Sequence, residues 1–158
     1  MKLSHVLSVL SLGFAISCTS SDEQKSEAME TPPTPTIKDE PKQVYWTSKG
    51  FANPESAYYD PTSKFIFVSN VAGNPGAKDR KGWISKLNDK GKILQNKWVE
   101  GLSAPEGLRA HKNTLWVSDI DQVVSIDIKK GKIIERFKVA GAEFLNDLAI
   151  DKMGAVYV

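Results

Sequence analysis

The feature that most constrains this fold is an internal repeat of short β-rich segments. The segment PESAYYDPTSKFIFVSN (54–70) aligns with PEGLRAHKNTLWVSD (105–119) and with LNDLAIDKMGAVYV (145–158). In each copy a polar residue precedes a short strand, a turn and a second strand that carries an aromatic residue. A second pair of segments also repeats, because WISKLNDKGKI (83–93) matches VVSIDIKKGKI (123–133). Each complete unit is therefore predicted to contain four strands.

The spacing between equivalent residues is 40. It separates Gly91 from Gly131, which we place in hairpin turns, and also separates Glu106 from Asn146. The first halves of the first two units lie nine residues further apart, which fits an inserted loop, GNPGAKDRK (73–81), in the first unit. The predicted strands are 55–60, 65–70, 82–87 and 92–100, then 106–110, 114–119, 122–128 and 132–139, and finally 146–151 and 155–158.

A four-stranded unit that recurs every 40–45 residues is typical of a β-propeller blade. We therefore predict an all-β fold, a β-propeller with blades at about 51–102 and 103–142 and the start of a third at about 143–158. A β-sandwich of hairpins is the alternative, although it does not explain the 40-residue period. Two and a half blades are fewer than a closed ring needs. We expect either that this chain is a fragment of a longer propeller or that several chains self-assemble into one ring.

The first 42 residues predict export and membrane attachment. Residues 1–17 combine a positive start, an apolar middle and small residues, as secretory signal peptides do. The sequence AISC (15–18) resembles a bacterial lipobox, which implies that Cys18 carries the lipid; a plain signal peptide is the alternative. Residues 18–42 are rich in proline and acid, so we predict a disordered tether. The predicted location is the bacterial cell envelope, with the lipoprotein anchored to a membrane and facing the periplasm or the exterior.

Charge and residue counts exclude several classes of function. The net charge is +2, and the basic residues after position 42 sit mainly in turns, so we expect no nucleic-acid partner. The lone cysteine is assigned to the lipid, so it is not a candidate nucleophile. His5 lies in the signal peptide, and His111 cannot supply a Ser-His-Asp arrangement by itself. Asp119 and Asp121 resemble half of a Ca²⁺ loop, but the glycine and closing glutamate are missing. We interpret both as exposed turn acids.

Oxygen-bearing side chains occupy equivalent places at the start of the innermost predicted strands. They are Glu55, Glu106 and Asn146. In a propeller these strand ends surround a central channel, so the three side chains are expected to converge. Carboxylate and amide oxygens suit a hard cation such as Ca²⁺, or another divalent metal. Glu55 is the stronger candidate ligand, because the PEG sequence around Glu106 is also an ordinary turn.

The motifs resemble one known family. GFANPESAYYDPTSKFIFVSNV is similar to the first blade of the SMP-30/gluconolactonase/luciferin-regenerating-enzyme family, and FLNDLAIDKMGAVYV is similar to its third. The resemblance implies a six-bladed propeller, with Glu55 as a metal ligand and with Asn146 and Asp147 in the substrate pocket. It also implies a metal-dependent hydrolase that acts on a lactone or a sugar-like ligand. Leu148 departs from the family pattern, which usually has glycine there, and the ligands of the fourth and fifth blades lie outside this sequence.

Two functions therefore remain as hypotheses. In the first, the chain belongs to an envelope-anchored, divalent-metal-dependent lactone hydrolase, inactive without the rest of its ring. In the second, it belongs to a non-catalytic propeller of the SMP-30 or NHL kind that binds a small molecule or a protein partner. The catalytic residues are unknown in either case.

Overall fold

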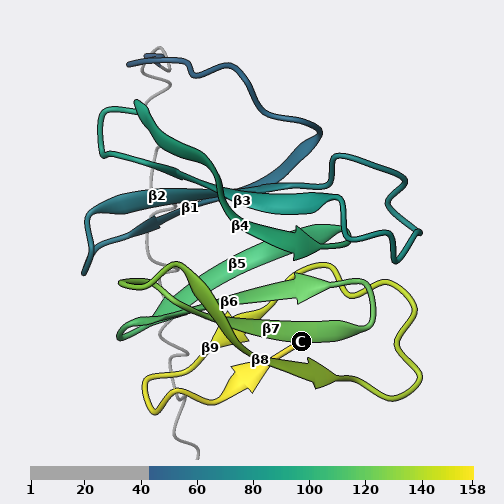
Figure 1. Ribbon diagram of the computed structural model, residues 1–158. Coiled ribbons are helices and arrows are strands. Elements are labelled where there is room, and N and C mark those ends of the chain that lie inside the picture. Colours follow the sequence, from purple (N-terminus) through teal and green to yellow (C-terminus); the bar gives the residue numbers. More distant parts are fainter. Residues whose placement is uncertain (1–42) are drawn as a thin grey trace, which may run out of the picture. The chain divides into compact units, whose positions relative to one another are not determined.

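The fold is described by a computed structural model in which residues 43–158 are placed well enough to describe. This part of the chain is all β, with antiparallel strands and no helix (Figure 1). The signal peptide, Cys18 and the tether lie outside the described residues. The strands are β1 (Pro54–Asp60), β2 (Phe65–Asn70), β3 (Gly82–Leu87), β4 (Ile93–Leu102), β5 (Pro105–His111), β6 (Thr114–Asp119), β7 (Gln122–Asp127), β8 (Lys132–Lys138), β9 (Ala149–Ile150) and β10 (Val156–Tyr157).

The strands form two four-stranded sheets and one two-stranded sheet. Each four-stranded sheet is a meander in which consecutive strands pair, in the orders β1-β2-β3-β4 and β5-β6-β7-β8. We call them the first and the second sheet. The two four-strand units predicted from the repeat are confirmed, with boundaries that agree to within two residues. No helix among these residues could cross a membrane.

The third unit differs from the prediction, because its strands are shorter. Strands were expected at 146–151 and 155–158, but β9 and β10 contain two residues each. The backbone just before β9 bonds to the second sheet instead. The Leu145 N–H donates to the Ile120 carbonyl at 2.7 Å, and the Asn146 carbonyl accepts from the Gly107 N–H at 2.9 Å. These backbone groups are therefore not available for pairing with β10.

The main core lies between the two four-stranded sheets. Strand β5 contacts both β1 and β2, so this edge strand of the second sheet packs against the first sheet. Side chains alternate between the two faces of a strand, so every second residue in the apolar parts of β6 and β7 lies in this core. Its buried members are Phe67, Ile84, Val99, Leu102, Leu108, Leu115, Val117, Val124, Ile126 and Ile128.

The hairpin turns contain the glycines that the repeat predicted. Gly91 and Gly131 have φ values of 75° and 62°, in the left-handed region that favours glycine. Each also lies under an indole ring, because an added Cβ would sit 2.4 Å from Trp46 at Gly91 and 2.6 Å from Trp98 at Gly131. The prediction of two equivalent glycine turns is confirmed.

Candidate functional site

A β-bulge at the start of each inner strand sets the direction of one glutamate in each sheet. In β1 the bulge falls on Glu55 and Ser56, and in β5 it falls on Glu106 and Gly107, since three steps along the inner strand oppose two on its neighbour. Bulges bend a strand and re-aim its side chains. The bulge of β1 lies between the strand pairs Pro54–Asn70 and Ala57–Val68. The bulge of β5 lies between the equivalent pairs Pro105–Asp119 and Leu108–Val117.

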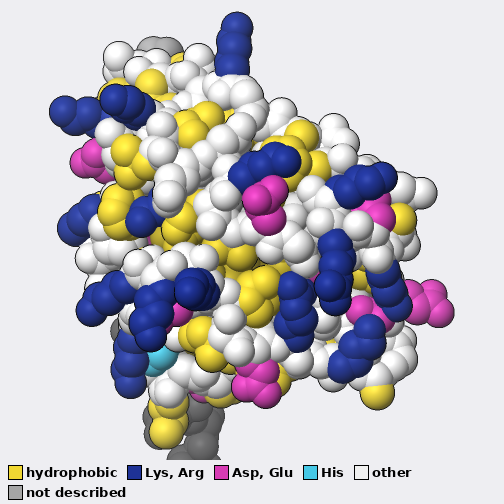
Figure 2. All heavy atoms as spheres, in the orientation of Figure 1, with side chains coloured by type: hydrophobic (Ala, Val, Ile, Leu, Met, Phe, Trp, Pro, Cys, Tyr) yellow, Lys and Arg dark blue, Asp and Glu magenta, His cyan; other side chains and the backbone are white. Residues whose placement is uncertain are grey.

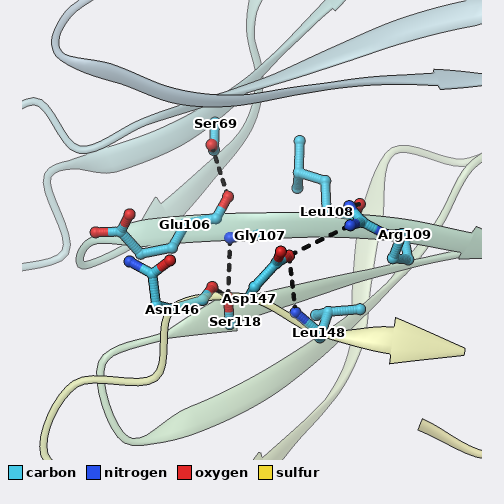
Figure 3. A network of polar contacts seen from close by, with 9 residues as sticks. All are labelled: Ser69, Glu106, Gly107, Leu108, Arg109, Ser118, Asn146, Asp147 and Leu148. Carbon is cyan, nitrogen blue, oxygen red and sulfur yellow. Dashed lines mark hydrogen bonds and ion pairs between the residues drawn. The ribbon is translucent and has the colours of Figure 1, made fainter. Parts of the chain in front are cut away.

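A serine hydroxyl links the first bulge to the second sheet. Ser69 Oγ on β2 accepts a hydrogen bond from the Ser56 N–H at 2.9 Å. The same hydroxyl donates to the Glu106 carbonyl at 2.8 Å, a bond drawn in Figure 3. Ser69 is fully buried, so the bond lies in a setting where an unpaired hydroxyl would be costly. It holds the two glutamate-bearing bulges in a defined relation.

The repeat uses the same device one unit later. Ser118 Oγ on β6 accepts from the Gly107 N–H at 2.9 Å and donates to the Asn146 carbonyl. Ser69 and Ser118 are equivalent in the aligned repeats, each in a Val-Ser dipeptide. Sequence analysis did not single out these serines, although their recurrence at equivalent positions was a usable signal. They connect the segments that carry Glu55, Glu106 and Asn146.

The three residues predicted as oxygen donors line one cavity. Its volume is about 170 Å³, and Asp147, the other predicted binding residue, also lines it. Figure 3 shows the Glu106 carboxylate and the Asn146 amide on the same side of β5. The structure therefore brings together all four residues that the aligned repeats and the family resemblance selected. The complete lining is Glu55, Ser56, Glu106, Gly107, Arg109, Asn146 and Asp147.

The carboxyl group of Glu106 is the electrostatic centre of this cavity. Glu106 is only 4% exposed, whereas Glu55 is exposed. The pKa of Glu106 is raised to about 7, first by burial and then by the charge of the nearby Glu55 and a hydrogen bond shared with it. Buried Asp119 contributes to the same rise in pKa. A positive ion placed between the two glutamates would relieve this repulsion.

Arg109 completes the rim of the cavity, and sequence analysis missed it. Its guanidinium lies 3.5 Å from Asp147 Oδ1, and the same carboxylate oxygen accepts from the Leu148 N–H at 2.9 Å. Side chains alternate between the two faces along a strand, so Arg109, two residues after Gly107, lies on the same side of β5. This alternation is the feature of the sequence that could have indicated Arg109. Asp147 thus has a fixed orientation at the rim, where its side chain is 69% exposed.

The interpretation of Asp119 and Asp121 as exposed turn acids is wrong. Asp119 is 1% exposed and Asp121 is 6% exposed. Asp121 lies between the ammonium groups of Lys78 and Lys138, which lower its pKa. Lys78 belongs to the inserted loop 73–81, so this loop reaches the β6–β7 turn. A loop that reaches across to the next sheet cannot be recognised from local composition.

The donor set around the cavity fits a hard cation. It offers two carboxylates, Glu55 and Glu106, and the side-chain carbonyl of Asn146, all of them oxygen ligands. After burial, the charge of Glu55 is the next cause of the raised pKa of Glu106, and Arg109, the cation of the cavity lining, pairs with Asp147. Within residues 43–158 no group of three or more histidine, cysteine, aspartate or glutamate side chains gathers at one point.

Comparison of the chain with protein-family models found no match, and comparison with curated protein sequences found none either. The resemblance to the SMP-30 family therefore rests on the motifs of this chain. Those motifs include Glu55, Asn146 and Asp147, which share one cavity.

Proposed function

We propose that residues 51–158 are blades of a β-propeller of the SMP-30/gluconolactonase type, and that the cavity between them binds a divalent cation, with Ca²⁺ as the first candidate. The first and second sheets would be two blades, and β9–β10 the start of a third. The observation that carries the proposal is the pair of matched bulges, which place Glu55 and Glu106 at one cavity beside Asn146. One oxygen donor from each of three successive units is the arrangement that a channel-centred cation site requires.

The residues that would hold the cation are Glu55, Glu106 and Asn146. A bound divalent metal would polarise the carbonyl of a lactone and help to activate water. The chain itself supplies the positioning groups, since the Arg109–Asp147 pair stands at the rim of the same cavity. A carboxylate and a guanidinium side by side can accept from and donate to the hydroxyls of a sugar-like ligand. The proposed activity of the whole protein is lactone hydrolysis.

A second candidate function is binding without catalysis, of a small molecule or of a protein partner. Two observations favour it. Leu148 occupies the place where the family usually has glycine, and its side chain is buried with 4% exposure. Asp147 is engaged by Arg109, which reduces its freedom to act on a substrate. A lactone-hydrolysis assay of the completed ring separates the two candidates, because Ca²⁺-dependent turnover of a sugar lactone by that ring favours the enzyme and Ca²⁺ binding without turnover favours the binding protein.

Calcium binding tests the proposed site directly. In isothermal titration calorimetry of the full chain, Glu106→Gln should weaken Ca²⁺ binding by at least about tenfold, because one anionic ligand is lost. The affinity should also fall as the pH drops below about 7, where Glu106 becomes protonated and neutral. Glu135→Gln is the matched control, since Glu135 is exposed on β8 and lies outside the cavity lining.

Equal Ca²⁺ affinity in the parent chain and in both Glu55→Gln and Glu106→Gln would contradict the assignment. So would the absence of any Ca²⁺ or Mg²⁺ binding heat at neutral pH. Far-ultraviolet circular dichroism of each variant shows whether the β fold is retained, which separates loss of a ligand from loss of structure.

We also propose that the protein is held at the cell envelope by a lipid on Cys18, the only cysteine. Acyl chains bind a membrane with about 0.8 kcal/mol for each buried CH₂ group, so two or more chains give stable attachment. Cys18→Ser should move the protein from the membrane fraction to the soluble fraction of an expressing bacterium. Ser26→Ala, a change within the tether, should leave it in the membrane fraction. A Cys18→Ser chain that still sediments with membranes, or an unmodified Cys18 in the mass spectrum, would disprove the anchor.

A further inference from the structure

A second, larger groove lies at the opposite ends of the strands from the glutamate cavity. Its volume is about 770 Å³, and it is formed by the β1–β2 turn, strand β3, the β5–β6 turn and the start of the β7–β8 turn. Pockets of this size accommodate small organic molecules. The residues that line it are Asp60, Thr62, Ser63, Phe65, Lys86, Lys112, Asn113, Ile128 and Lys129. It therefore spans the first and the second sheet.

The groove carries an excess of positive charge. Lys86, Lys112 and Lys129 line it together with a single acid, Asp60. None of the ion pairs within residues 43–158 includes any of these three lysines. Asp60 is buried and its carboxylate oxygens accept from the backbone N–H groups of Thr62 and Ser63, at 3.2 and 3.0 Å. Figure 2 shows Lys and Arg side chains along the left edge, where Figure 1 places the hairpin turns.

Lys86 is the most enclosed of the three cations. It is half-buried on β3, and its ammonium group lies 3.8 Å from the centre of the Phe65 ring. Partial burial lowers the pKa of Lys86, which shows that the protein does not fully compensate its charge. An anion beside Lys86 would stabilise its charged form. The aromatic face of Phe65 holds the ammonium group in place but does not neutralise it.

Ser63 adds an unused hydrogen-bonding group in the same groove. Its Oγ is buried, and no partner for it exists among the residues that the structure describes. Buried hydroxyls nearly always have a partner, so this unpaired hydroxyl is available to a group bound in the groove once its side chain turns toward it. The apolar part of the wall comes from Phe65 and from Ile128, a member of the core.

We propose that this groove binds a small organic anion, a monocarboxylate with an aromatic or aliphatic body. The carboxylate would accept hydrogen bonds from Lys86 and Ser63, while the body would lie beside Phe65 and Ile128. Lys112 and Lys129 favour the approach of the anion through their positive field. The site lies on different residues from the proposed cation site, so either one can fail without affecting the other.

Phenylbutyrate is a suitable probe, with phenylbutanol as its uncharged counterpart. The full chain carrying Cys18→Ser avoids detergent, which would compete for an amphiphilic site. By isothermal titration calorimetry, phenylbutyrate should bind with a Kd below about 1 mM and phenylbutanol at least about tenfold more weakly. In nuclear magnetic resonance spectra, the backbone amide signals of Ser63 and Asn113 should shift when phenylbutyrate binds, while those of Glu106 and Gly107 should not.

Two variants test the assigned contacts. Lys86→Gln should weaken phenylbutyrate binding by at least about tenfold. Ser63→Ala should weaken it by a few-fold without loss of stability, because the Ser63 hydroxyl has no hydrogen-bond partner within residues 43–158. Lys90→Gln, an exposed lysine of the β3–β4 turn outside the groove, should bind as the parent does. The proposal is overturned by a failure of phenylbutyrate to bind, by equal binding of phenylbutanol, or by unchanged affinity in both Lys86→Gln and Ser63→Ala.

Discussion

Asp119→Ala should lower the free energy of unfolding by about 3 kcal/mol, because it leaves buried donors without an acceptor. Asp119 Oδ1 accepts from the Ala104 N–H at 2.7 Å and the Ser103 N–H at 3.1 Å, and Oδ2 accepts from the Gln122 amide at 2.9 Å. These bonds tie the start of β5 to the end of β6. Urea denaturation of the full chain, followed by tryptophan fluorescence, measures the effect.

The first sheet provides the control for this prediction. Asn70 occupies the place equivalent to Asp119, and its side-chain oxygen accepts from the Ala52 N–H at 3.0 Å. An amide therefore already performs this function once in the molecule. Asp119→Asn retains the oxygen that receives both backbone N–H groups and should cost less than about 1 kcal/mol. If Asp119→Ala and Asp119→Asn were equally stable, the hydrogen bonds would not be the reason for the buried carboxylate.

Gly107→Ala should detach the segment before β9 from the second sheet and lower stability by about 1–3 kcal/mol. A Cβ at Gly107 would lie 2.8 Å from Asp147 Oδ1, 2.9 Å from the Asn146 carbonyl oxygen and 2.9 Å from the Asp147 Cα. Two of these atoms belong to the backbone, so the clash cannot be relieved by rotating a side chain. Because Asn146 and Asp147 would move, binding at the glutamate cavity should weaken as well.

The matched control is Ser56→Ala, since Ser56 is the counterpart of Gly107 in the first sheet and already carries a Cβ. It should leave stability close to that of the parent. Hydrogen exchange gives a local measure, because the Leu145 N–H donates to the Ile120 carbonyl at 2.7 Å. The Leu145 amide should exchange faster in Gly107→Ala than in the parent, and its exchange rate should be unchanged in Ser56→Ala. Unaltered exchange in Gly107→Ala would show that the segment tolerates the added methyl group.

Local patterns predicted the strands well, and the reason is physical. Alternating side chains, turn residues and a 40-residue period all describe short-range geometry, which acts in the same way in each unit. The strands from β1 to β8 and the turn glycines Gly91 and Gly131 were predicted on this basis. The third unit was predicted too long, because hydrogen bonds to Ile120 and Gly107 come from a different sheet.

The candidate site was predicted only in part. Alignment of the repeats selected Glu55, Glu106 and Asn146, since equivalent positions in stacked units face the same way. Arg109 was missed because its importance depends on Asp147, which is far away in the sequence and 3.5 Å away in space. Asp119 was taken for an exposed acid because a two-residue turn looks the same whether or not another loop reaches it.

The sequence by itself determined the four-stranded unit, its period and the glutamate that begins an inner strand in each of the first two units, because these depend on backbone geometry and on local residue preferences. Only the tertiary structure decided the environment of those residues. It buried Glu106 beside Glu55 so that its pKa is about 7, and among residues 43–158 it left the Ser63 hydroxyl unpaired in a groove lined by lysines. Burial and charge depend on which segments pack together, and that packing joins residues from both sheets.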